Sequence, residues 1–351
     1  EMTSSLVGSE MCIRDSPTGI LTEELKQKAR TSIGNTLETP VIDYDADITI
    51  GSTRTLTIAD SENTSKMVQI TFATYAWGFT IAPAMYMNNE IGIQKDFETK
   101  MMKYIYAFAK KLDEAALAAL AANKTQVLKN PLLYNWSANA VNAKWTEREN
   151  VFGDLEVMMG ANDFYGQLHL VGDPGVESIM RKLQQHGLYN DVNKHNEFGT
   201  KIVHLTNNIA AAENKYAQGY AVNAGSLGML TRFERDCLLG TVSGDGHEWG
   251  IATLPLLNMP VGTYFYDSVG DYNTIAGTAT ADMTRTRKEH YGFAVDVAFL
   301  TAHNSKPSTN ASPILAFNIS SEDAAYAKPV VVVNSKDNPV NTKEASAGVG
   351  G

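Results

Sequence analysis

Cysteine is nearly absent from this sequence of 351 residues, which contains only Cys12 and Cys237. Two cysteines cannot form the disulfide framework of a small secreted domain, so the composition favours a reducing compartment. Seven histidines are scattered along the chain, and no pair of Cys or His has the spacing of zinc ligands. The sequence therefore predicts no metal site and no cofactor, and Cys237 is interpreted as a small core residue.

Long apolar runs and long basic runs are also missing. No run of about eighteen apolar residues occurs, so we expect no membrane-spanning helix. The formal net charge of −10 argues against a protein that holds nucleic acid by neutralising phosphates. The densest basic positions are interpreted as dispersed surface charge: Arg232, Arg235, Arg285, Arg287 and Lys288. A hydrophobic content of 44% instead predicts a soluble globular chain with two or more lobes.

The most regular pattern in the chain lies in residues 89–122. Apolar residues recur there every three or four positions, as they do on one face of a helix, and no proline interrupts them. The row consists of Ile93, Phe97, Met101, Ile105, Phe108, Leu112, Ala116 and Leu120. A helix over the whole stretch would be about 50 Å long. Because the row does not keep a heptad spacing, we expect a brace that packs on a sheet of its own subunit, not a coiled coil.

A short helix and a long hairpin are predicted before this stretch. The segment LTEELKQKARTSI has helical spacing, with Thr22 as its N-cap and Gly34 as its end. Residues 41–80 then alternate with period two, which indicates strands with one buried face. The alternating apolar positions are Ile48, Ile50, Leu56 and Ile58 in the first run, followed by Val68, Ile70 and Phe72. Such a hairpin has too little core of its own, so we expect it to be stable only on a neighbouring subunit.

The second half of the chain mixes helices and strands. A helix is predicted at VFGDLEVMMGANDF, with Phe152, Leu155, Val157 and Met158 near one side. A strand at 167–171 is followed by a helix that Asp173 caps, Pro174 begins and Gly187 ends. Further strands are KIVHL, YGFAVDVAFL and PILAFNIS, with a last one at 330–333 before a polar tail. The pattern indicates an α+β fold in which a mixed sheet is flanked by helices.

This order of elements resembles the major capsid protein of tailed double-stranded DNA bacteriophages, which has the Hong Kong 97-type fold. Residues 48–74 are similar to the extended loop of that family, and 93–120, with FAKKLDEAALAALA, to its spine helix. The segment LHLVGDPGVESIMRKL resembles its apical strand and Pro-started helix. HYGFAVDVAFL and PILAFNI resemble the strands that return to its peripheral domain. The order and spacing of these segments carry the resemblance, because none of them is specific alone.

The resemblance also implies a division of the chain. The expected parts are an N-terminal arm at 17–40, the extended loop at 41–87, a peripheral domain with the spine helix at 88–150, an axial domain at 151–285, return strands at 286–320, and a C-terminal strand and tail at 321–351. Residues 1–16 contain SSLVGSEMCIRDS, which resembles a translated sequencing adapter. We therefore leave this segment, including Cys12, out of the fold prediction.

The function implied by the resemblance is structural and not enzymatic. The chain would assemble with itself into the hexamers and pentamers of an icosahedral phage head, built in the host bacterial cytoplasm around double-stranded DNA that it contacts weakly and non-specifically. Scaffolding, portal and decoration proteins would be further partners. The expected contacts between subunits lie on the extended loop, at Arg54, Leu56, Ile58, Lys66, Val68 and Ile70. Some family members join a lysine of this loop covalently to a neighbour, but nothing local marks Lys66 as reactive, so we predict no crosslink.

Two alternative functions remain open at the level of sequence. An encapsulin-like nanocompartment would share the fold and enclose a cargo enzyme. A hydrolase would use His247, in SGDGHEW, or the cluster of Asp43, Asp45 and Asp47, which could also hold Ca²⁺. A glycine-rich turn and a solvated strand face explain these two segments more simply. His169 and His204 lie in apolar strand patterns and are interpreted as sheet residues with satisfied hydrogen bonds.

Overall fold

The computed structural model describes residues 23–32, 34–42, 65–86, 92–188, 201–210, 212–233, 235–240, 246–273, 283–301 and 311–321. Within these ranges the helices are α3 (Glu23–Thr31), η1 (Pro83–Tyr86), α4 (Ile93–Ala122), η2 (Trp145–Glu147), α5 (Val151–Ala161), α6 (Pro174–Leu188) and α8 (Arg235–Leu239). The strands are β1 (Thr36–Ile42), β2 (Ser65–Thr71), β3 (Ala73–Ile81), β4 (Asn135–Ser137), β5 (Ala140–Ala143), β6 (Leu168–Gly172), β7 (Lys201–Leu205), β8 (Lys215–Asn223), β9 (Leu227–Arg232), β10 (His247–Leu254), β11 (Met259–Asn273), β12 (Met283–Thr301) and β13 (Ile314–Ser320). This mixture of segregated helices and largely antiparallel sheets is the α+β fold that the sequence predicts.

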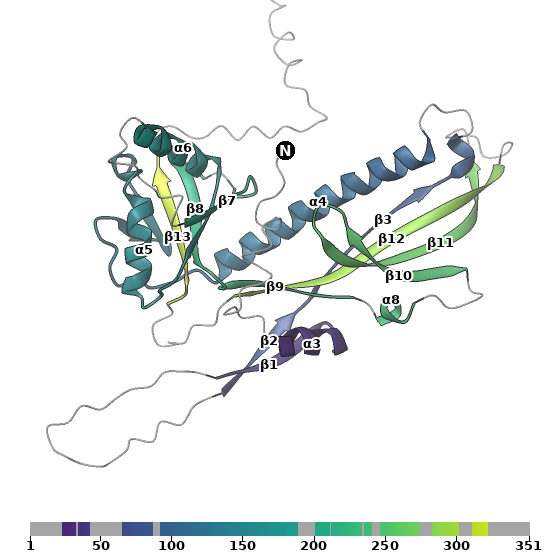
Figure 1. The fold of residues 1–351 in the computed structure, drawn as a ribbon, viewed down its shortest axis with the longest axis horizontal. Helices are drawn as coiled ribbons and strands as arrows, with labels where there is room; N and C mark the ends of the chain where they lie inside the picture. The colour runs from purple at the N-terminus through teal and green to yellow at the C-terminus, as the bar shows by residue number, and fades with distance from the viewer. Residues whose placement is uncertain are drawn as a thin grey trace, which may run out of the picture.

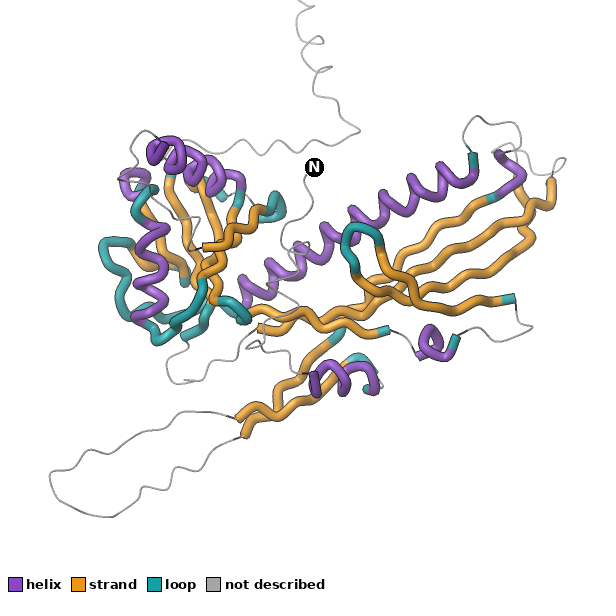
Figure 2. Tube along the Cα trace, in the orientation of Figure 1, coloured by secondary structure: helices purple, strands orange, loops and turns teal. Residues whose placement is uncertain are grey.

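The long helix α4 lies along a five-stranded sheet, as Figure 1 shows. The order of the strands is β10-β11-β12-β3, and β9 pairs with the remaining length of β12. Alternate residues of β12, including Phe293 and Val295, face the helix and share a core with Ile105 and Phe108. Phe108 stacks on Trp77 of β3 with ring centroids 4.6 Å apart. The helix and the sheet therefore form one continuous unit, the beam, and Figure 2 shows the helix running along the strands.

The far end of α4 meets a separate lobe built on a six-stranded sheet. Its strand order is β4-β5-β13-β8-β6-β7, and α5 and α6 supply the helices of the lobe (Figure 1). Phe152 of α5 and Phe317 of β13 lie together in the core of this lobe, edge to face with an angle of 83° between the rings. Leu117 and Leu120 of α4 share another core with Val171 and Val222. Strand residues alternate between the two faces of this sheet. One face packs against α5 and α6, and α4 covers part of the opposite face.

Local signals in the sequence account for the start of α6. The Oδ1 atom of Asp173 accepts a hydrogen bond from the backbone N–H of Val176 at 3.0 Å, and Pro174 is the first helical residue. Gly175 is required at the next position, because a Cβ atom there would lie 2.1 Å from the carbonyl oxygen of Tyr216. The helix continues through Gly187 to Leu188, since a glycine weakens a helix without necessarily ending it.

Several sequence-based expectations differ from the structure in detail. Ile93 is 40% exposed, because the first turn of α4 lies at the margin of the shared core. Val157 is 56% exposed, because it follows Leu155 by about 200° around α5 and so points away from the lobe. The arm predicted at 17–40 contains α3 but also most of strand β1.

The assignment of strands to domains also differs. β10 and β11 fall in the stretch expected for the axial domain, yet they pair with β12 in the sheet along α4. β13, expected among the return strands of the peripheral domain, lies inside the six-stranded sheet between β5 and β8. The alternation of apolar residues reports that a strand is half-buried, but it does not identify the partner strand.

Candidate functional site at the hairpin root

The base of a projecting hairpin lies on the face of the five-stranded sheet opposite α4. We call α3, β1 and β2 the hairpin root. β1 and β2 form an antiparallel ladder from Thr36 opposite Thr71 to Ile42 opposite Ser65. In Figure 1 this ladder leaves the body of the molecule, while α3 lies beside it. Ala298 of β12 has the opposite parity from the residues that face α4, and it contacts the hairpin root.

An apolar cluster attaches the hairpin root to the sheet. It is made of Leu25, Ala29, Leu37, Ile70, Phe72, Leu230 and Ala298, with Leu300 at its margin. Leu25 and Ala29 are four residues apart and share one face of α3, which explains why this short helix forms against the sheet. Burial of this cluster supplies adhesion, but the hydrophobic effect has no preferred direction.

A buried arginine supplies directional contacts at the same place. Arg232 of β9 is 6% exposed and lies directly opposite Asp296 of β12 in the ladder, with Nε 2.9 Å from Oδ2. Its Nη1 donates to Ser32 Oγ at 3.2 Å and its Nη2 to Asn35 Oδ1 at 3.4 Å. The guanidinium carbon is 4.3 Å from the centre of the Phe72 ring. On the other side of Asp296, the hydroxyl of Thr74 donates to Oδ1 at 2.6 Å.

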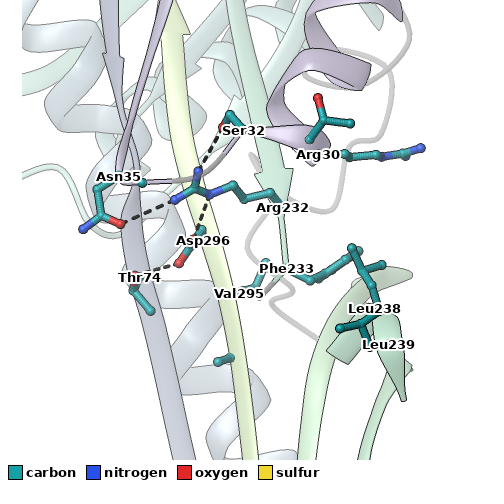
Figure 3. Close-up of a pocket in the computed structure, with 13 residues that line it drawn as sticks. Arg30, Ser32, Asn35, Thr74, Arg232, Phe233, Leu238, Leu239, Val295 and Asp296 are labelled. Atoms are coloured by element: carbon teal, nitrogen blue, oxygen red, sulfur yellow. Dashed lines mark hydrogen bonds and ion pairs between the residues drawn. The ribbon is translucent and has the colours of Figure 1, made fainter. Parts of the chain in front are cut away.

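These residues form what we call the Arg232 network, which Figure 3 shows with its bonds dashed. The network joins four separate parts of the chain: the segment between α3 and β1, strand β3, strand β9 and strand β12. The Nε, Nη1 and Nη2 atoms of Arg232 each donate to an acceptor, and the carboxylate of Asp296 accepts from both Arg232 and Thr74. These bonds offset part of the desolvation cost of the pair, whose side chains are 8% exposed in Arg232 and 18% exposed in Asp296.

A pocket of about 760 Å³ opens beside the Arg232 network. Arg30, Ser32 and Asn35 line one side, and Leu238 and Leu239 of α8 line the other (Figure 3). Both leucines are exposed, Leu239 by 72%. Arg232 and Asp296 pair with each other, and the lining is mixed, with polar residues beside them and leucines of α8 opposite.

The predicted row along α4 bridges both sheets. Ile105, Phe108 and Leu112 lie in the core against the five-stranded sheet, and Phe97 and Met101 pack at its edge half-buried. Leu120 and Ala116 lie in the core against the lobe. The row is thus shared between two sheets of the same chain, with Ile93 exposed at one end.

The predicted hairpin contacts are only partly within the described residues. Ile70 is buried in the hairpin root, Val68 is half-buried, and Lys66 lies opposite Val41 in the ladder. Arg54, Leu56 and Ile58 lie outside the described residues, as do Asp43, Asp45 and Asp47, so the role of these residues stays a prediction.

The enzymatic alternative gains no support from His247. Its ring is hydrogen-bonded to the hydroxyl of Tyr264, stacks on that ring and tilts against Tyr266, which is the setting of a residue in an aromatic row across β10 and β11. His169 and His204 are buried and hydrogen-bonded to each other, with Nδ1 3.2 Å from Nε2. Burial lowers the pKa of His169, which favours the neutral ring.

Other sequence-based expectations can be compared with the described part of the chain. Cys237 is buried against Gly262, where a Cβ atom would lie 2.7 Å from its sulfur. In the ranges that the structure describes, no three His, Cys, Asp or Glu side chains form a cluster that could hold a metal ion. No helix within those ranges is both long and apolar enough to cross a membrane.

Sequence reasoning missed the Arg232 network, although one signal was present. Arg232 has the same parity in its strand as Leu230, which is buried, so a charge was placed on an apolar face. Asp296 interrupts an apolar strand in the same way. Two opposite charges on apolar faces of strands predict an ion pair, but not which strands pair.

Comparison with known proteins gives matches at the level of structure alone. No family model and no curated protein matches this chain. A solved structure from Mycobacterium phage Bobi has 12% identity and a TM-score of 0.47, covering 92% of this chain and 100% of that one. The asymmetric unit of the bacteriophage PhiM1 mature capsid has 9% identity and a TM-score of 0.46, covering 87% of this chain and 90% of that one. The capsid of Ralstonia phage GP4 has 12% identity and a TM-score of 0.43, covering 83% and 85%.

Proposed function

We propose that this chain is a major capsid protein that assembles with itself into the hexamers and pentamers of an icosahedral phage head. The observation that carries the proposal is the hairpin root. A strand ladder projects from the body and is held there by a buried polar network and an apolar cluster. An isolated two-stranded ladder is marginal in water, so an extended ladder of this kind is best explained by a partner that it reaches.

The shape of the rest of the molecule supports a tile in a shell. α4 has 30 residues and is therefore about 45 Å long. It shares one core with the five-stranded sheet and another with the lobe, so it connects both parts stiffly. A stiff, elongated body with a projecting element can make head-to-tail contacts that close into rings.

The charge of the chain fits a wall around DNA better than a protein that condenses it. With a net charge of −10, the subunit would contact the packaged double-stranded DNA weakly and without sequence preference. The proposed location is the virion, after assembly in the cytoplasm of the host bacterium. Scaffolding, portal and decoration proteins are the further partners that this function requires or permits.

Assembly of the purified protein tests the proposal. We expect closed shells by electron microscopy and a fast-sedimenting species by ultracentrifugation when a scaffolding protein is supplied. A chain that stays monomeric at high concentration under these conditions would overturn the proposal. Nuclease-resistant DNA inside particles from cells indicates a phage head, whereas particles that hold a cargo enzyme and no such DNA indicate the encapsulin-like alternative.

We propose no covalent crosslink between subunits, because Lys66 has no sequence context that would activate it. Purified shells boiled in detergent should give a single band at the monomer mass of 38.2 kDa on a denaturing gel. A ladder of higher bands under reducing conditions would contradict this prediction.

A further inference from the structure

We infer that Arg232 is a positioning residue that fixes the direction in which the hairpin leaves the sheet. The inference rests on the proposed function, because the direction of the hairpin would set the angle between neighbouring subunits. Among the described residues, the chain passes from the hairpin root to the five-stranded sheet between β2 and β3. Phe72 is the single residue between the end of β2 at Thr71 and the start of β3 at Ala73.

Phe72 acts as the pivot of this passage. Its backbone N–H donates to the carbonyl oxygen of Asn35 at 2.8 Å, and its side chain is buried in the cluster that attaches the hairpin root. A single residue has two soft backbone dihedrals, so the backbone at Phe72 does not by itself fix the direction of the ladder. Contacts that cross the pivot are needed to select one direction.

Arg232 makes contacts on both sides of the pivot. On the side of the hairpin it donates to Ser32 and Asn35, and on the side of the sheet it pairs with Asp296. Asp296 is in turn opposite Thr74 of β3 and accepts its hydroxyl. Figure 3 shows the guanidinium between these two groups of residues.

The chemistry of the guanidinium suits this role. Its donors have a fixed planar geometry, so three bonds in three directions define its orientation and thereby that of the groups it binds. Its face lies on the Phe72 ring, which adds a contact at the pivot itself. A lysine would keep the charge beside Asp296 but would lose the fork that reaches Ser32 and Asn35 together.

Two variants separate direction from stability. Arg232→Lys keeps a cation beside Asp296, and the double variant Ser32→Ala with Asn35→Ala removes only the bonds on the side of the hairpin. The matched control is Arg287→Lys, which changes another arginine of the same sheet in an exposed ion pair with Asp267. If Arg232→Lys fails to fold because it disturbs a buried pair, the double variant decides the question.

The experiment measures the direction of the hairpin in the monomer. Spin labels are attached at Met67→Cys on β2 and Tyr106→Cys on α4, both exposed positions, in a Cys12→Ser background. We expect one narrow distribution of distances in the parent and in the Arg287→Lys control. Both test variants should lose the single narrow peak, and their particles should lose uniform size.

Unchanged distance distributions in both test variants, with the parent narrow, would overturn the role of Arg232. Failure of the proposed function gives a different result. In that case the parent would show the narrow distribution, the variants would broaden it, and no protein would form particles.

Discussion

At the scale of single residues, Asp113 of α4 is the carboxyl group with the most unusual environment among those described. It is 1% exposed, and its Oδ2 accepts a weak hydrogen bond from Asn208 at 3.4 Å. Its Oδ1 has no hydrogen-bond partner within the described part of the chain. Burial raises the pKa of Asp113 from 3.8 to about 6. The folded protein therefore holds the proton of Asp113 more tightly than the unfolded chain does.

The sign of the pH dependence follows from this direction. Between about pH 4 and pH 6, Asp113 is ionised in the unfolded chain but still largely protonated in the folded protein. The free energy of unfolding therefore falls as the pH rises through this range and stays lower above pH 6. Asp113→Asn removes this loss. We expect the variant to gain of order 1–3 kcal/mol above about pH 7 and nothing below about pH 4. Chemical denaturation across this range measures the difference.

The control for this prediction is Asp163→Asn, which changes an exposed carboxylate that pairs with Lys129. Its effect should be small, because exposed ion pairs contribute little. A parent and an Asp113→Asn variant with parallel stability curves from acid to neutral pH would show that Asp113 titrates normally.

At the scale of elements, the beam made by α4 and the five-stranded sheet depends on aromatic packing. Phe108 is buried, stacks on Trp77 and meets the edge of Tyr75 at a centroid distance of 5.7 Å. Phe108→Ala should lower the free energy of unfolding by about 3–5 kcal/mol. Tyr106→Ala, two residues earlier and exposed, should change it by about 0.5 kcal/mol or less. Equal losses in the two variants would mean that α4 does not bury its predicted face.

The elements also show which features of the fold could be predicted from the sequence and which could not. Periodicity located α4, and the Asp173–Pro174 pair located the start of α6, because these signals are local. The sheet that β10, β11 and β13 join depends on pairing between distant segments, which alternation does not encode. Arg232 and Asp296 each place a charge on an apolar strand face, which is a local signal in the sequence. The hydrogen bond from Arg232 to Ser32 spans 200 residues and has no local signal.

At the scale of the whole molecule, the segment 43–64 joins the far ends of β1 and β2 and has apolar residues of one parity. If a neighbouring subunit covers that face in the shell, removing its apolar side chains should abolish assembly and leave the melting temperature of the monomer unchanged. The test variant is I48S/I50S/L56S/I58S. The matched control alters the other parity with equal numbers of substitutions, T49S/T53S/T55S/T57S.

The expected difference in assembly between the test variant and the control is large, because each contact between subunits is repeated many times in a shell. Burial of apolar area contributes about 25 cal/mol per Å², and every subunit would both give and receive one hairpin. A loss that is modest for one contact is repeated around each ring, so closed particles should disappear from sedimentation profiles of the test variant and persist in the control. Normal shells from the test variant would show that the hairpin does not hold neighbours together. Loss of shells in both variants would show that the segment is needed for a reason other than its apolar face.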